Sequence, residues 1–386
     1  MNDTAQSLLA HLRTHQSAMA SLLADLGRME SPSHDPAAQE PVFARLAAEL
    51  AASGLRTRRL AGRASGGQLW AVPRERRRGR AAQLLLGHCD TVWPAGTVAG
   101  MPVEIRDGRL TGPGVYDMKA GLVQGIFALR ALRELGLPAE METAFFINSD
   151  EEIGSLESLP RIGKLARRVR RVFVLEPSLG PAGRLKTRRK GSLRFTIKVS
   201  GKAAHSGLDP EKGASAILEL SRVIRRLYEL ADPARGITVN VGVVSGGLRA
   251  NVVAPEARAE LDVRVLGWED AVRIEQTVHA FEPETPGTSL EVLGGIDRPP
   301  LEATPGNRRL WEAALRRAGE LGIELGEGTA GGASDGSLTS RVVPTLDGLG
   351  AVGDGAHAVH EHVLLDRMPE RAALLALLLL EPDEGS

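Results

Sequence analysis

The chain is organised around a glycine-rich turn at residues 112–121, GPGVYDMKAG, which carries the single carboxylate Asp117. An apolar-periodic run follows at residues 121–135 and predicts a helix. Glycines let a backbone bend sharply and approach a ligand closely. An aspartate at a helix entrance also serves as an N-cap, and for Asp117 taken alone this is the simpler interpretation.

Two neighbouring motifs favour a ligand role for Asp117 instead. GHCDT at residues 87–91 precedes the turn, and SDEEIG at residues 149–154 follows it. Each motif ends an apolar run and supplies a metal-type ligand, His88 or Glu152. A lone histidine or glutamate at a strand end is usually a hydrogen-bonded surface residue, so it is the combination of motifs that indicates a metal site.

Short apolar runs predict the strands of the first domain, at residues 69–72, 82–86, 143–147 and 172–175. We expect further helices at residues 4–28, 41–52, 307–321 and 372–380. Strands that alternate with helices indicate an α/β fold with a mostly parallel central sheet. Ligands bind such sheets beyond the carboxyl ends of the strands, where His88, residues 150–152 and Glu176 are expected to meet.

The pattern changes between residues 190 and 300. Strands with polar–apolar alternation and two helices follow one another there in the order β-α-β-β-α-β. This order predicts a ferredoxin-like domain. We therefore expect an insertion at residues 190–300 within a discontinuous first domain, made of residues 1–189 and 301–386.

Composition narrows the class of protein. The 386 residues include 48 basic and 48 acidic side chains, a balance that favours neither nucleic acid nor an anionic membrane as partner. The basic run at residues 74–80 is interpreted as a solvated hairpin loop. The single cysteine, Cys89, fits a reducing compartment. With no signal peptide and no apolar run long enough to cross a bilayer, we expect a cytoplasmic protein.

Five residues form the expected metal-binding set, which mixes imidazole with carboxylate: His88, Asp117, Glu152, Glu176 and His357. This mixture suits zinc or cobalt, and five ligands hold two ions if one carboxylate bridges them. His360 and His362 compete with His357, but the Ala-His-x-x-x-Glu spacing that ends at Glu361 favours His357.

Two acidic positions support this set. Asp90 lies two residues after His88, on the same face of an extended chain, and is placed to accept the other imidazole N–H. Glu151 and Glu152 are adjacent, so one can hold metal while the other takes a proton from water. Cys89 points to the face opposite His88, which argues against a cysteine nucleophile.

The motifs, in this order, closely resemble those of the M20 co-catalytic zinc metallopeptidases, which include glutamate carboxypeptidases, acetylornithine deacetylases and succinyl-diaminopimelate desuccinylases. The resemblance implies two zinc ions per subunit, with cobalt or manganese as alternatives, and a cis peptide bond after Asp117. It further implies that Asp117 bridges the ions, that His88 and Glu176 bind different ions, and that Glu151 is the general base.

The insertion resembles the lid and dimerisation domain of this family. The resemblance implies a homodimer in which His205 reaches the active site of the partner subunit and stabilises the oxyanion. It also implies that Asn251 and Arg264 hold a substrate carboxylate, and that Asp335 lies in a glycine-rich substrate loop.

Three functional hypotheses follow. The first is a dinuclear zinc hydrolase that cleaves an amide beside a free carboxylate in a small peptide, most like a glutamate-type carboxypeptidase. The second is a deacylase of N-acyl amino acids, which uses the same bond chemistry. The third is a non-catalytic binding homologue, which a missing base or ligand would favour; none is missing.

Overall fold

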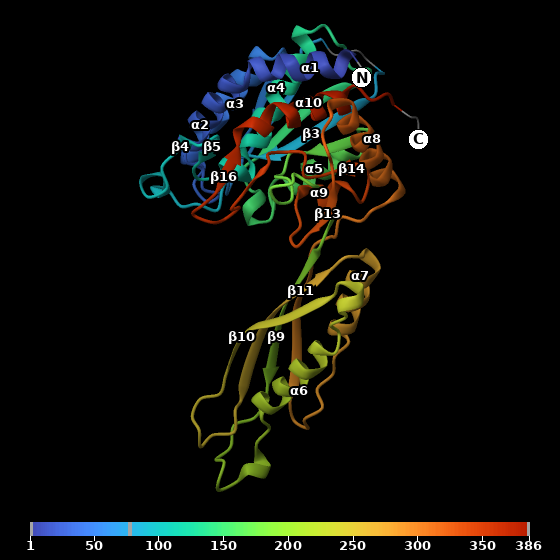
Figure 1. Cartoon of the computed structure of the whole chain (residues 1–386). Helices are drawn as coiled ribbons and strands as arrows, with labels where there is room; N and C mark the ends of the chain where they lie inside the picture. The colour runs from blue at the N-terminus through green and yellow to red at the C-terminus, as the bar shows by residue number, and fades with distance from the viewer. Residues whose placement is uncertain (1–2, 76–78, 384–386) are drawn as a thin grey trace. The chain divides into compact units, whose positions relative to one another are not determined.

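A computed structural model describes residues 3–75 and 79–383. The chain forms two compact units (Figure 1). The first comprises Met1–Thr187, Ala303–Ala330 and Ser334–Ser386, and the second comprises Arg188–Glu302 and Gly331–Ala333. The sequence placed the domain boundaries after residues 189 and 300, and the units divide after residues 187 and 302.

The first unit is built on a six-stranded sheet in the order β1-β2-β6-β3-β7-β14. Four strands are parallel: β3 (Ala82–His88), β6 (Glu142–Asn148), β7 (Arg171–Val174) and β14 (Thr345–Leu346). At one edge β1 (Leu55–Leu60) and β2 (Gln68–Pro73) run antiparallel. The predicted mostly parallel α/β sheet is confirmed.

The basic run at residues 74–80 does not close a hairpin. Strand β6 lies between β2 and β3, so the segment crosses from one strand to another that is not its neighbour. Residues 76–78 of the run lie outside the described residues.

Helices bury both faces of this sheet. Side chains alternate between the faces along each strand, so neighbouring residues of one strand belong to different clusters. Leu85, Phe145 and Phe173 join a cluster with α1 (Asp3–Thr14), α2 (Gln16–Arg28), α4 (Ala120–Glu134), α8 (Pro305–Leu321) and α10 (Met368–Leu379). Their neighbours Leu84, Phe146 and Val172 face α5 (Leu159–Ala166) and belong to a second cluster. A short helix, α9 (Asp335–Thr339), packs beside α5.

The N-terminal helices differ from the prediction in two ways. The single helix expected at residues 4–28 is broken at His15, whose backbone N–H bonds to Leu12 O at 3.1 Å. Helix α3 (Pro36–Ala52) starts five residues earlier than expected, because the carboxylate of Asp35 accepts the N–H groups of Ala37 and Ala38 as an N-cap.

A small sheet brings two distant segments of the first unit together. Its order is β15 (Gly353–Asp354), β16 (His362–Leu364), β5 (Arg109–Thr111) and β4 (Glu104–Arg106). Because β16 pairs with β5, the loop that carries His357 lies beside the start of the glycine-rich turn. A further pair joins β8 (Leu185–Arg189) and β13 (Glu327–Ala330).

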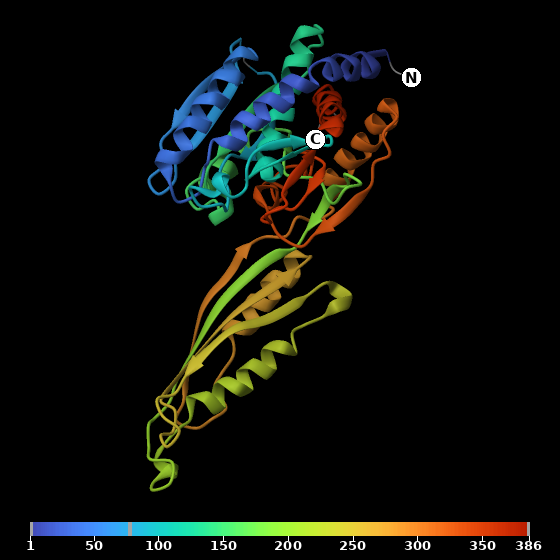
Figure 2. The same cartoon turned by 60° about the vertical axis from the view of Figure 1, so that its left-hand side comes forward.

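The second unit has its own core. Its elements occur in the expected order: β9 (Gly191–Ser200), α6 (Ala216–Tyr228), β10 (Thr238–Gly246), β11 (Glu256–Val265), α7 (Trp268–His279) and β12 (Ser289–Arg298). The strands form an antiparallel sheet in the order β10-β11-β9-β12. Helices α6 and α7 cover one face (Figure 2), where Phe195 and Leu261 are among the buried residues.

Candidate metal centre

The glycine-rich turn is held in shape by one buried carboxylate, that of Glu361. Its oxygens accept the backbone N–H groups of Gly114 (3.0 Å), Tyr116 (2.9 Å) and Asp117 (3.0 Å), and the indole N–H of Trp93 (2.9 Å). Burial raises the pKa of Glu361 while these four donors oppose the rise. The sequence pointed to Glu361 only as a spacing mark, and its contacts identify it as the residue that positions Asp117.

The turn enters α4 directly after the cis peptide bond between Asp117 and Met118. Helix α4 approaches the end of β7 so closely that a Cβ on Gly121 would lie 1.9 Å from Leu175 O. Only glycine fits this position, and the approach brings the turn toward Glu176, which follows β7 by two residues.

Asp117 directs its two carboxylate oxygens toward two different sets of side chains. Oδ1 lies 3.4 Å from His88 Nε2, which is itself 3.5 Å from Glu176 Oε1. Oδ2 lies 3.5 Å from His357 Nε2, which is 3.1 Å from Glu152 Oε2. The result is two three-residue groups that share Asp117.

This grouping corrects one expectation. His88 and Glu176 were expected to bind different ions, but they stand on the same side of Asp117. The physical reason is that β3 and β7 are adjacent parallel strands, so the residues at their ends meet at the same edge of the sheet.

The separations within each group suit a metal ion. Ligand atoms about 2.05 Å from a tetrahedral zinc ion lie about 3.3 Å from one another. Three buried ligand atoms have no hydrogen-bond partner among the described residues: His88 Nε2, Asp117 Oδ1 and Glu152 Oε1. Because buried polar atoms normally have partners, this donor set fits bound cations.

The local charge points the same way. Hydrogen bonds to Asp117 and Glu152 raise the pKa of His357 to about 10, although partial burial of its half-exposed ring opposes the rise. Burial and the neighbouring charge of Asp117 raise the pKa of Glu152 above its ordinary value. A concentration of negative charge that holds protons on nearby groups would be neutralised by divalent cations. On the far side of Glu176, Lys186 Nζ lies 3.6 Å from Oε2.

Asp90 connects the two sides of the site. Its Oδ1 is 3.3 Å from His88 Nδ1, the ring nitrogen that faces away from Asp117, and its backbone O is 3.1 Å from the same nitrogen. The same carboxylate accepts the backbone N–H groups of Glu151 (3.3 Å) and Glu152 (3.2 Å). Asp90 is fully buried and thus fixes the histidine and the acidic turn relative to each other.

Asp335 is buried within the first unit rather than displayed on a loop. Its carboxylate accepts hydrogen bonds from Asn148 Nδ2 at 2.8 Å and Ser155 Oγ at 2.5 Å. These contacts hold the segment that contains Glu151 and Glu152, so they support a positioning role. Its contact with substrate stays a prediction.

The competing histidines stand outside the ligand groups. His362 lies in β16, where its Nδ1 is 3.0 Å from His360 O, and neither ring joins either group around Asp117.

In the second unit, two predicted site residues lie on paired segments. His205 bridges to Val252, and Ser206 N–H donates to Asn251 O at 3.1 Å. His205 Nδ1 accepts the N–H groups of Gly207 and Leu208, 3.1 Å each, so the proton of the neutral ring is on Nε2. The guanidinium of Arg264 holds the carboxylate of Asp262 through two hydrogen bonds of 2.6 and 2.9 Å, and its contact with substrate stays a prediction.

Comparison with known proteins places these observations in context. The sequence profile of Peptidase family M20/M25/M40 matches residues 84–381. Carboxypeptidase G2 of Pseudomonas sp. (strain RS-16) is 28% identical over 313 residues, which cover 80% of this chain and 75% of that protein. Succinyl-diaminopimelate desuccinylase of Dechloromonas aromatica (strain RCB) is 28% identical over 337 residues, covering 81% and 85%.

A solved structure shares the fold. The aminopeptidase PepT of Bacillus cereus ATCC 10987 aligns with a TM-score of 0.79 over 95% of this chain and 98% of its own, at 22% sequence identity.

Proposed function

The chain belongs to peptidase family M20/M25/M40, and we propose that it is a dinuclear hydrolase that cleaves the amide bond beside a free carboxylate, as a glutamate-type carboxypeptidase does. The observation that carries the proposal is the position of Asp117. One of its oxygens faces His88 and the other faces His357, so a single carboxylate serves two ligand groups.

The proposal assigns one cation to His88, Asp117 and Glu176, and a second to Asp117, Glu152 and His357. Zinc is the ion this donor set favours, with cobalt or manganese as alternatives. Cations bound there would polarise the scissile carbonyl and lower the pKa of water.

Glu151 is the proposed general base. It shares a tight turn with Glu152, and Asp90 holds the backbone N–H groups of both residues. Its carboxylate takes one proton from the attacking water, whose oxygen adds to the carbonyl carbon. The same proton then passes to the amine nitrogen as the C–N bond breaks.

The second unit is proposed to complete the site as a lid in a homodimer. The Nε2–H group of His205 in one subunit would donate a hydrogen bond to the oxyanion formed in the other. The backbone N–H groups that bond to Nδ1 support this role, because they leave the ring proton on Nε2. Asn251 is proposed to hold the substrate carboxylate. For Arg264 the same role requires that it leave Asp262 or share its guanidinium with two carboxylates.

The substrate is proposed to be a small peptide or N-acyl amino acid. One relative is named carboxypeptidase G2, which supports the first proposal. Another is named a desuccinylase, and for this reason deacylation is the second candidate. No helix in residues 3–75 and 79–383 is both long and apolar enough to cross a membrane. We propose a cytoplasmic location from the sequence, because its single cysteine fits a reducing compartment.

The test is hydrolysis of a substrate panel by zinc-loaded protein: N-benzoylglutamate, simple dipeptides, N-acetylornithine and N-succinyl-diaminopimelate. Glu151→Gln keeps the shape of the side chain and removes the base. Glu104→Gln, at an exposed position on β4, is the matched control.

We expect turnover of one substrate class by the wild type and by Glu104→Gln. Glu151→Gln should lose it while its zinc content stays unchanged. Turnover of N-acetylornithine or N-succinyl-diaminopimelate, without turnover of N-benzoylglutamate or the dipeptides, would select the deacylase. A Glu151→Gln variant as active as the wild type would overturn the assignment of the base.

A further inference from the structure

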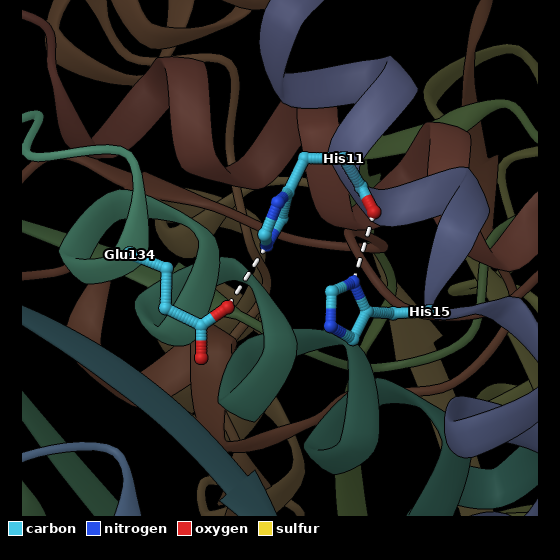
Figure 3. A group of neighbouring side chains, drawn as sticks. All are labelled: His11, His15 and Glu134. Atoms are coloured by element: carbon cyan, nitrogen blue, oxygen red, sulfur yellow. Dashed lines mark hydrogen bonds and ion pairs between the residues drawn. The ribbon is translucent and has the colours of Figure 1, made fainter.

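A second cluster of metal-type ligands lies in the first unit, away from Asp117 (Figure 3). His11, His15 and Glu134 each offer one ligand atom, and these atoms all lie within 4.8 Å of one another. The structure points to a separate binding site here for a single divalent transition-metal ion, which we propose on the three observations that follow. This inference does not depend on the proposed function.

The first observation is the helix break at His15. Because the backbone N–H of His15 bonds to Leu12 O, the carbonyl of His11 is left to accept side-chain donors. It accepts the Thr14 hydroxyl at 2.7 Å and His15 Nδ1 at 2.9 Å. In a continuous helix this carbonyl would bond to the backbone N–H of residue 15, so the break is what recruits the imidazole of His15.

The second observation is the tautomer that these contacts impose. His15 Nδ1 faces His11 O and also lies 3.2 Å from Thr14 Oγ1, whose proton goes to the same carbonyl. Nδ1 therefore carries the proton, and Nε2 of the neutral ring keeps its lone pair. A backbone carbonyl that accepts the other ring N–H is the usual support of a metal-binding histidine.

The third observation is the pair formed by His11 and Glu134. His11 Nε2 lies 3.0 Å from Glu134 Oε2, close to the separation of about 3.3 Å between two ligands of one zinc ion. Within the described residues Glu134 has no other ion-pair partner, so no arginine or lysine competes for its carboxylate. A cation would take the place of this direct contact between His11 and Glu134.

The cluster also has room for an ion to arrive. The side chains of His11 and Glu134 are 21% and 42% exposed, and the two imidazole rings lie 4.5 Å apart at 38° to each other. Two imidazoles and one carboxylate leave a coordination position for water. Imidazole nitrogen suits zinc, nickel and copper, and zinc is the probe we choose.

The site is remote from the Asp117 centre. Glu134 is the last of the 15 residues of α4, and at about 1.5 Å per residue it lies about 21 Å along the helix from Ala120. An ion here would connect the α1–α2 junction to the end of α4, as a cross-link between the N-terminal helices and the core of the first unit.

The test counts metal by difference. Metal-free protein is dialysed against about 10 µM free zinc, and bound zinc per chain is measured by mass spectrometry. The variants are His15→Gln and Glu134→Gln. The control is His279→Gln, which removes an exposed histidine of the second unit.

We expect each cluster variant to hold about one zinc fewer than the wild type, and the control to hold as many as the wild type. Because the result is a difference, it does not depend on the occupancy of the Asp117 centre. Equal zinc content in the wild type and both cluster variants would overturn the proposal.

A local readout keeps the test independent of folding. Diethyl pyrocarbonate modifies accessible histidines, and zinc should protect His11 and His15 from it in the wild type but not in Glu134→Gln. Modification that is the same with and without zinc would also overturn the proposal.

Discussion

The two units hold their predicted site residues under different conditions. In the first unit His88 and Asp90 are almost completely buried, and His88 Nδ1 lies 3.1 Å from Asp90 O and 3.3 Å from Asp90 Oδ1. In the second unit His205 and Asn251 are exposed; a backbone hydrogen bond joins their segments, and His205 Nδ1 accepts two backbone N–H groups. This difference in burial suggests that the two units have different tasks. A rigid, buried network fixes ligands, while an exposed donor remains available to a substrate. The predictions below test this division.

The largest effect is expected from Asp117→Asn. The amide keeps the shape of the side chain but removes the charge that both ligand groups share, so activity should fall by about 10³-fold or more, because bound metal contributes several kcal/mol. Zinc per chain and kcat/KM are the measurements. Asp107→Asn is the matched control, since Asp107 is exposed and asparagine tolerates its positive φ of 49°. A variant that keeps both zinc and activity would remove Asp117 from the centre.

His205→Ala should lower kcat by about 10² to 10³-fold, the usual cost of a lost oxyanion donor. Zinc content should not change, since the residue lies outside the ligand groups. A loss of zinc together with activity would break the proposed division between the units. Unchanged kcat would exclude His205 from the reaction.

Glu361→Gln tests the support of the turn. Whichever way the amide is placed, its NH₂ group faces two of the four donors that Glu361 now accepts. Zinc affinity should fall by about 10- to 100-fold, as for other residues that position a ligand. Trp93→Phe removes one donor only and should weaken zinc binding less. Equal effects of the two changes would contradict this account.

Glu157→Gln should give the smallest effect, on stability rather than catalysis. Burial alone would raise the pKa of Glu157, but hydrogen bonds from Ser65 Oγ and three backbone N–H groups lower it to about 2. Because the folded pKa is depressed, the stabilisation is present above the ordinary value of 4.5 and is lost as the pH falls toward 2.

Urea denaturation of the wild type and Glu157→Gln at two pH values measures this effect. The wild type should be the more stable at pH 7, and the gap should narrow when the pH falls below about 4. A gap that widens with acid would show that the carboxylate is not stabilising.

Much of the fold could be predicted from periodicity. The apolar runs that became β3, β6 and β7 are continuous because helices cover both faces of these strands. The positions of His88 and Glu176 after strand ends followed from the same pattern. Strand order is different: nothing in residues 74–80 indicates that β6 separates β2 from β3.

The parts of the site that escaped prediction depend on contacts between distant residues. Glu361 binds the N–H of Gly114, 247 positions away, and Asp335 binds Asn148, 187 positions away. Motif spacing identifies such residues without showing which way they face. The assignment of His88 and Glu176 to different ions was wrong for the same reason, because sequence order does not tell which side of Asp117 a ligand occupies.

The discontinuous first unit has a consequence for synthesis on the ribosome. Residues 188–302 form a contiguous stretch with its own core, so the core of this unit is complete once its last strand has emerged. The first unit must wait for β14, then for Glu361, which holds the glycine-rich turn made more than 200 residues earlier, and finally for the buried helix α10. The nascent chain therefore exposes the apolar surface that α10 covers until α10 itself has been synthesised, and exposed apolar surface of this kind favours aggregation.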